Sequence, residues 1–255
     1  EEQDFLIVGS ILPDIHLSGL IEYHKTHTNG KEFFNYVANR HHKISALGII
    51  MHAEKPFGID HYTHKWEGFI HNNSKEVGAI ARKFQKTIGK VDAMTIHHLT
   101  EFTIDHILAR KNPRLIQRVK QAFKNRRTNS VITAFASFHE MGEKKNKKII
   151  SILKSRHVIK FIKNFGSLEG TAQNWLSLKF YRDLKEGKTL SKSEKIKRMA
   201  KFSLLNIKYK ISDKEICKMF YELTLLLEKR SEDFLKEAQQ KVKPIKDEYW
   251  TNIQN

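Results

Sequence analysis

Apolar side chains recur at three- and four-residue intervals through most of this chain, and this repeat constrains its fold most strongly. After residue 74 the sequence is dominated by Lys, Leu, Ile, Phe and Glu at helical spacing, as in the stripe Ile216, Phe220, Leu223 and Leu227. Only four prolines and twelve glycines interrupt the 255 residues. The pattern predicts an all-α protein, a multi-helix bundle with a substantial core.

Breaks in the repeat predict where the first helices begin and end. We expect irregular chain over residues 1–32, a helix over 33–53 and a loop over 54–72. Ser74 has the residue type that caps the next helix, and Gly89 the type that stops it.

The remaining helices follow from the same signals. Asp92 opens a helix that runs to about Arg110. From Pro113 onward the pattern predicts five or six amphipathic helices, with boundaries near Asn125, Gly142, Gly166, Gly187 and Ser212.

Charge divides the sequence into two halves. Residues 1–110 hold 12 Lys and Arg against 13 Asp and Glu, whereas residues 111–255 hold 34 against 15. We therefore distinguish a His- and Asp-rich half, 1–110, from a basic helical half, 111–255. The two halves can also pack together as one continuous domain. The basic half predicts phosphate-bearing partners, such as nucleic acid, an anionic lipid surface or a phosphorylated small molecule. Solvated lysine-rich helix faces are the alternative.

Cysteine and hydropathy say little about location. The single cysteine, Cys217, excludes an intramolecular disulfide. The apolar stretch from Phe5 to Leu12 is too short to cross a bilayer and lacks the features of a signal peptide. We expect a cytoplasmic protein, with a removed leader left open because the chain starts at Glu1. The oligomeric state is left open.

Histidine is concentrated in the first half, where 12 of the 14 lie among carboxylates at short intervals. His and Asp/Glu without cysteine form the ligand set of catalytic zinc and related metal sites. The helix from Asp92 places His97 and Glu101 four residues apart on one face, with His98 also within reach of Glu101. Asp105 continues that face as a group that orients a ligand.

Further candidate ligands precede this helix. Asp14 follows a Leu-Pro step at the end of an apolar segment, where a carboxylate is unfavourable unless a cation compensates it or it caps the turn. The other candidates are His24 and His27 on a short turn, His52 at the end of an apolar helix, and Asp60, His61 and His64 just beyond it. Together they predict a metal site, although the ligand of each neighbouring histidine pair stays open.

The order of these motifs resembles that of the zinc-dependent phospholipase C-like family, which shares its type of zinc cluster with single-strand-specific nucleases. The resemblance rests on Gly-Ser-Ile-Leu-Pro-Asp ending at Asp14, on Leu-Gly-Ile-Ile-Met-His ending at His52, and on His97-x-x-x-Glu101, and it covers about residues 6–108. It implies an all-α fold and one to three zinc ions that hydrolyse phosphate esters.

The resemblance also implies how the ligands are divided between two zinc ions. Asp14, His27 and His52 would bind one zinc, and His61 or His64 with His97 and Glu101 another. The sequence departs from the family where a bridging aspartate is expected, because Pro56 stands there and only Glu54 or Asp60 can substitute.

The chemistry expected from such a site is hydrolysis by a zinc-activated water, with Glu54 or Asp105 as general base. The substrate would be a phosphodiester, a phospholipid head group or single-stranded nucleic acid. A nuclease is the alternative enzyme. A non-catalytic nucleic-acid- or partner-binding protein with a degenerate metal site is the alternative outside enzymes.

Overall fold

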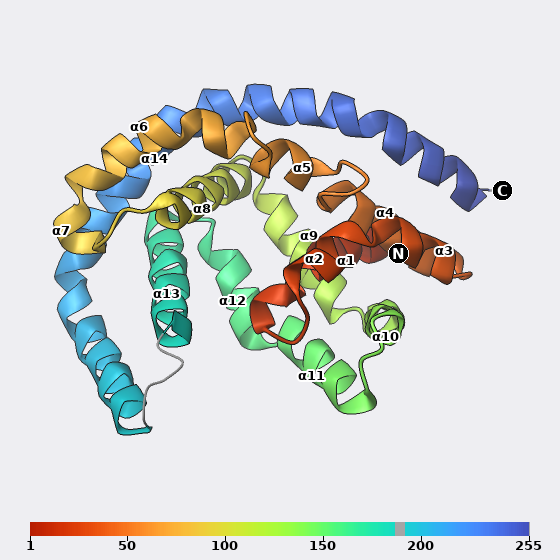
Figure 1. Ribbon diagram of the computed structural model, residues 1–255, viewed down its shortest axis with the longest axis horizontal. Coiled ribbons are helices and arrows are strands. Elements are labelled where there is room, and N and C mark those ends of the chain that lie inside the picture. Colours follow the sequence, from red (N-terminus) through yellow and green to blue (C-terminus); the bar gives the residue numbers. More distant parts are fainter. Residues whose placement is uncertain (187–191, 255) are drawn as a thin grey trace. The chain divides into compact units, whose positions relative to one another are not determined.

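The structure, a computed structural model, describes the backbone of residues 1–186 and 192–254, and the side chains of that range apart from residues 180–213. Its regular structure is helical and no strand occurs among these residues, so the predicted all-α class is confirmed (Figure 1). No described helix is both long and apolar enough to cross a membrane.

The chain forms two compact units. Unit 1 contains Glu1–His71, Arg114–Lys160 and Glu232–Asn255, and unit 2 contains Asn72–Pro113 and Phe161–Ser231. Each unit therefore combines residues from both sides of residue 110.

The first segment of unit 1 is more helical than predicted. Its elements are α1 (Glu2–Ile11), the 3₁₀ helix η1 (Leu12–Ser18), α2 (Tyr23–Thr28), α3 (Gly30–Tyr36), α4 (Arg40–His52) and α5 (Ile59–His64). The expectation of irregular chain over 1–32 is wrong, because Pro13 occupies the first turn of η1, where its missing N–H is not needed.

The expected single helix over 33–53 is also wrong, because it is divided near Asn39. Val37 is extended, and the Asn39 side chain accepts hydrogen bonds from the backbone N–H groups of His41 and His42 to begin α4. The expected loop over 54–72 likewise contains α5, and α6 (Phe69–Lys83) begins before Ser74.

Helices α1 and α4 pack against each other and run in the same direction. Phe5 stacks on His41 near the start of both helices, and Ser45 Oγ donates to the Phe5 carbonyl at 2.8 Å. Further along, a Cβ on Gly9 would overlap the Ser45 carbonyl, and one on Gly48 would overlap the Leu6 carbonyl. Two glycines thus permit the close approach that brings the C-terminal ends of both helices to one place.

The rest of unit 1 covers this pair. Helix α10 (Asn129–Phe138) packs on α3, α4 and α11 (Glu143–Leu153), and Phe135 meets Phe33 edge-to-face at 5.5 Å. The end of α14 (Lys192–Gln254) adds Tyr249, whose ring lies 4.8 Å from that of Phe34. Additional helices of unit 1 are α9 (Pro113–Lys124), η2 (Arg126–Thr128) and the first five residues of α12 (Arg156–Asn164).

Unit 2 contains the helix predicted from Asp92. Asp92 Oδ1 accepts from the Thr95 N–H and caps α8 (Ala93–Lys111), as expected. Gly89 ends α7 (Gln85–Ile88) with a positive φ, which also agrees with the prediction. Helix α8 packs on α13 (Leu168–Glu186).

The predicted boundary at Ser212 is wrong, because α14 continues through it and serine without a glycine or proline nearby does not break a helix. The predicted boundary at Gly187 lies outside the described residues.

Gly9→Ala should lower the free energy of unfolding by about 3 kcal/mol, because its Cβ would collide with the rigid backbone of α4. Urea denaturation followed by circular dichroism measures this. Gly142→Ala is the matched control, since a Cβ there has nothing within 4 Å. Equal midpoints for the two variants would contradict the close α1–α4 contact.

His139 gives unit 1 an acid-sensitive point. Its ring packs edge-on against Phe135 and Phe138 at 4.6 and 4.8 Å, and its Nε2 is buried without a hydrogen-bond partner. Burial, helped by the charge of Lys25, lowers the pKa of His139 to about 4. The neutral ring therefore stabilises the fold above the unfolded pKa near 6.5, and this contribution is lost as pH falls toward 4.

His139→Gln should lose less stability than the wild type when the pH falls from 6.5 to 4, because glutamine stays neutral. Thermal unfolding across this range measures the difference. Exposed His157→Gln should keep the wild-type slope. An unchanged slope in His139→Gln would contradict the buried, neutral state of this ring.

Candidate metal centre

Four side chains from four elements of unit 1 converge where α1 and α4 end. Asp14 lies in η1 directly after α1, and His52 is the last residue of α4. His27 comes from α2 and Asp60 from α5. Because the negative ends of helix dipoles favour cations, two parallel helices ending here favour a positive charge.

The distances between their polar atoms match a metal site. Asp60 Oδ2 lies 3.4 Å from His27 Nε2 and 3.3 Å from His52 Nε2, and Asp14 Oδ1 lies 3.7 Å from His52 Nε2. Ligands of a tetrahedral zinc ion at 2.0–2.1 Å are about 3.3–3.4 Å apart. Charge-assisted hydrogen bonds would be shorter, at about 2.7–2.9 Å.

One atom of the cluster supports this interpretation independently. His52 Nε2 is buried, and despite the nearby carboxylates it has no hydrogen bond of acceptable geometry. Buried polar atoms rarely remain unsatisfied. Asp14, His27 and His52 offer ligand atoms within 4.8 Å of one another, and Asp60 adds a second carboxylate. These residues therefore fit a divalent metal ion.

The two imidazoles titrate in opposite directions. Burial, reinforced by the charge of His52, lowers the pKa of His27 to about 4. Burial also opposes the charging of His52, but the carboxylates of Asp14 and Asp60 outweigh it and raise the pKa of His52 to about 9. Asp60 itself has a lowered pKa, because its interaction with His52 outweighs its burial. The cluster thus holds a positive charge between two carboxylates when no metal is bound.

A set of contacts fixes the ring of His27. Its Nδ1 lies 3.1 Å from the Tyr23 carbonyl and 2.8 Å from Thr26 Oγ1, so an Nδ1–H donates there and Nε2 keeps its lone pair. Tyr23 stacks on the His27 ring at 4.0 Å and 19°. The hydroxyl of Tyr23 donates to Glu54 Oε1 at 3.0 Å, and the Glu54 N–H donates to the His27 carbonyl.

Of the two carboxylates expected to replace the bridging aspartate, Asp60 lies against both imidazoles, whereas Glu54 faces Tyr23. The sequence pattern did not indicate Tyr23, Thr26 or His16, whose ring meets that of His27 edge-on at 5.0 Å. Tyr23 stands four residues before His27 on one short helix, which is the signal that would have indicated it.

Of the other histidines predicted in unit 1, His24 and His61 are separate from this cluster, whereas His64 adjoins it. The His24 side chain is 68 % exposed, with Nε2 3.5 Å from Glu22. The His61 ring lies 4.5 Å from that of Phe57, and burial and Lys65 lower its pKa. His64 follows Asp60 by one turn of α5 and contributes to the lowered pKa of Asp60.

The remaining candidates lie on α8 in unit 2. His97 Nε2 is 3.1 Å from Glu101 Oε1, so the predicted i,i+4 pair meets on one face. Asp105 is exposed one turn later. Because the second predicted ligand set takes members from both units, it stays a prediction.

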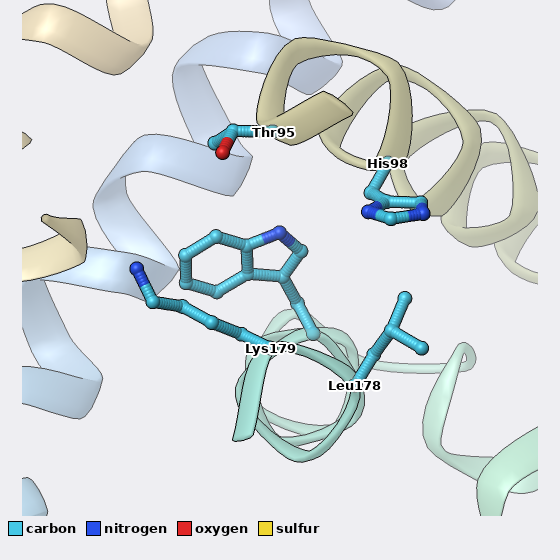
Figure 2. Close-up of a pocket in the computed structure, with 5 residues that line it drawn as sticks. Thr95, His98, Leu178 and Lys179 are labelled. Carbon is cyan, nitrogen blue, oxygen red and sulfur yellow. The ribbon is translucent and has the colours of Figure 1, made fainter. Parts of the chain in front are cut away.

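His98 lines a separate small pocket of unit 2. Figure 2 shows His98 and Thr95 of α8 facing Leu178 and Lys179 of α13. Trp175 also lines the pocket. The pocket volume is only about 10 Å³. The Lys179 ammonium lies over the Trp175 ring and donates to the Ile88 carbonyl. A pocket of this volume holds at most about one water molecule.

Tyr23→Leu should weaken zinc binding by about 100-fold and Tyr23→Phe by about 10-fold, since the first loses the stack on His27 and the second only the contact with Glu54. Chelator competition gives the affinities, and the visible spectrum of the cobalt-substituted protein reports ligand geometry. Exposed Tyr36→Phe is the control. Wild-type affinity in Tyr23→Leu would show that the stack does not position His27.

Comparison of the chain with protein-family models, with curated proteins and with solved structures gives no match. The resemblance to zinc-dependent phospholipase C-like proteins therefore stays a prediction, and the cluster in unit 1 is the basis for a functional proposal.

Proposed function

We propose that the protein is a metal-dependent hydrolase of phosphate esters, with zinc as the expected ion. The convergence of Asp14, His27, His52 and Asp60 around the unsatisfied Nε2 of His52 carries the proposal. Two histidines and a carboxylate are a ligand set of catalytic zinc sites.

The ligands differ in exposure, and this suggests separate roles. His27, Asp60 and His52 are 1, 16 and 20 % exposed, whereas Asp14 is 45 % exposed. The three less exposed side chains would therefore hold the ion. Asp14, the most exposed of the four, would be the side chain that accepts a proton from water.

When bound, a divalent ion supplies polarisation of a phosphoryl oxygen and acidification of water. The chain supplies the rest. Asp60 holds both imidazoles in register, and Tyr23 with Glu54 keeps the His27 lone pair directed into the site. Glu54 is engaged by Tyr23, so positioning suits it better than the base role expected from the sequence.

Exposed apolar side chains close to the ligands in sequence favour an amphiphilic substrate. Leu17, Phe57, Ile59 and Trp66 are 51, 51, 37 and 78 % exposed. Each stands within six residues of Asp14 or Asp60. Phe57 also adopts a positive φ, a strained conformation for a bulky residue. A phospholipid fits such surroundings, and a single-stranded nucleic acid that stacks on Trp66 is the second candidate.

Wild-type protein purified without a metal-affinity tag should contain at least one zinc per chain after zinc addition and dialysis. Asp60→Asn and His52→Ala should lose it, whereas His24→Ala should retain it because His24 is exposed. Elemental analysis measures all four. Wild-type zinc content in both ligand variants would rule out this centre.

Activity provides the second part of this test. The zinc-loaded protein should hydrolyse a chromogenic phosphodiester, and chelation should abolish the activity until zinc is restored. Asp14→Asn should retain most of its zinc yet lose turnover by at least about 100-fold. Phospholipid vesicles and single-stranded oligonucleotides then separate the two substrate classes. Full zinc occupancy without turnover on any of them would favour the non-catalytic alternative.

A further inference from the structure

Unit 1 concentrates its positive charge in one stretch. Residues 114–160 hold 13 Lys and Arg against 2 Asp and Glu. The other segments of the same unit are mildly acidic, with 6 against 9 in residues 1–71 and 4 against 5 in residues 232–255. A generally lysine-rich composition would raise the net charge of all three segments alike. The segregation therefore needs another explanation.

Most basic side chains of this stretch are exposed and lack carboxylate partners. The structure describes residues 114–160 completely. Two of their basic residues form ion pairs, Arg127 with Glu1 and Lys147 with Glu143. The exposed basic residues without an ion pair include Arg114, Arg118 and Lys124 of α9 and Lys144, Lys145 and Lys148 of α11.

The last segment of unit 1 shows the opposite arrangement. On α14, Lys241 pairs with Glu237, and both Lys243 and Lys246 pair with Asp247. Lysines there are balanced at intervals of a helical turn or less, as on an ordinary solvated face.

The basic helices are also joined to each other. Lys154 Nζ, just after α11, donates at 2.8 Å to the carbonyl of Asn125, which follows α9. Arg126 adjoins this contact, and burial together with the Arg126 charge lowers the pKa of Lys154. The fold thus brings the like charges of Lys154 and Arg126 together at a cost in repulsion. Such an arrangement is stabilised when an anionic surface covers it.

We infer that the face formed by α9, η2 and α11 docks unit 1 onto an anionic lipid surface. Polybasic segments bind such surfaces electrostatically, and stable attachment takes a second, apolar signal. Leu115 is exposed beside Arg114 on α9, and the same unit carries exposed Leu17, Phe57 and Trp66.

Nucleic acid fits this face less well. The stretch 114–160, which is described in full, exposes no Phe, Tyr or Trp on which bases can stack. Eight of its 13 basic residues are lysines, which act as point charges without the fork geometry of arginine. Lipid head groups need only the charge.

The test uses the full-length protein and sedimentation with vesicles of phosphatidylcholine containing 30 % phosphatidylglycerol. The α11 variant combines Lys144→Gln, Lys145→Gln, Lys147→Gln and Lys148→Gln. The matched control combines Lys236→Gln, Lys241→Gln, Lys243→Gln and Lys246→Gln, which removes the same charge from α14 in the same unit. Far-ultraviolet circular dichroism verifies folding, and Arg114→Gln with Arg118→Gln on α9 replaces the α11 variant if that one unfolds.

The wild type should bind these vesicles but not pure phosphatidylcholine, and binding should weaken as salt rises. The α11 variant should lose affinity by about 600-fold, at about five-fold for each of its four lysines, and the α9 variant by about 25-fold. The control should stay within about three-fold of the wild type.

Three results would overturn the inference. These are no binding by the wild type, equal loss in the α11 variant and the control, or tighter binding to duplex DNA than to the vesicles. The basic residues of this face are not among the metal ligands, so Asp60→Asn should still bind the vesicles. Loss of hydrolysis would therefore leave this inference intact.

Discussion

The close parallel contact of α1 and α4 is the constraint on which the metal centre depends. Gly9 and Gly48 let the two backbones approach, and Ser45 ties α4 to α1 through the Phe5 carbonyl. Because the helices run in the same direction, their C-terminal ends deliver Asp14 and His52 to one point. A side chain at either glycine would separate the helices and, with them, the two ligands.

The cluster gathers opposite charges in a largely buried position. Burial opposes the charging of His52, but the carboxylates of Asp14 and Asp60 flank it and raise its pKa to about 9. A divalent cation would satisfy the same field and would bind the His52 Nε2 atom, which lacks a hydrogen bond. Tyr23, Thr26 and Glu54 keep His27 in the tautomer that such a cation requires.

Particular residues show how far the sequence could predict these features. The sequence could predict that Asp92 caps a helix and that Gly89 ends one, because each depends on one residue and its local backbone. Gly9 was expected in irregular chain, since a glycine that permits helix packing has the same sequence signal as one in a turn. His27 could not be chosen over His24 from spacing. The choice depends on which side of a six-residue helix is buried.

The sequence by itself determined the all-α class, the enrichment of metal-ligand residues in the first half and the basic character of the second. These are properties of periodicity and composition, which need no knowledge of neighbours. Only the tertiary structure decided that Asp60 reaches both imidazoles and that Glu54 instead holds Tyr23. Those outcomes depend on contacts between segments far apart in the chain, whose distances no local pattern encodes.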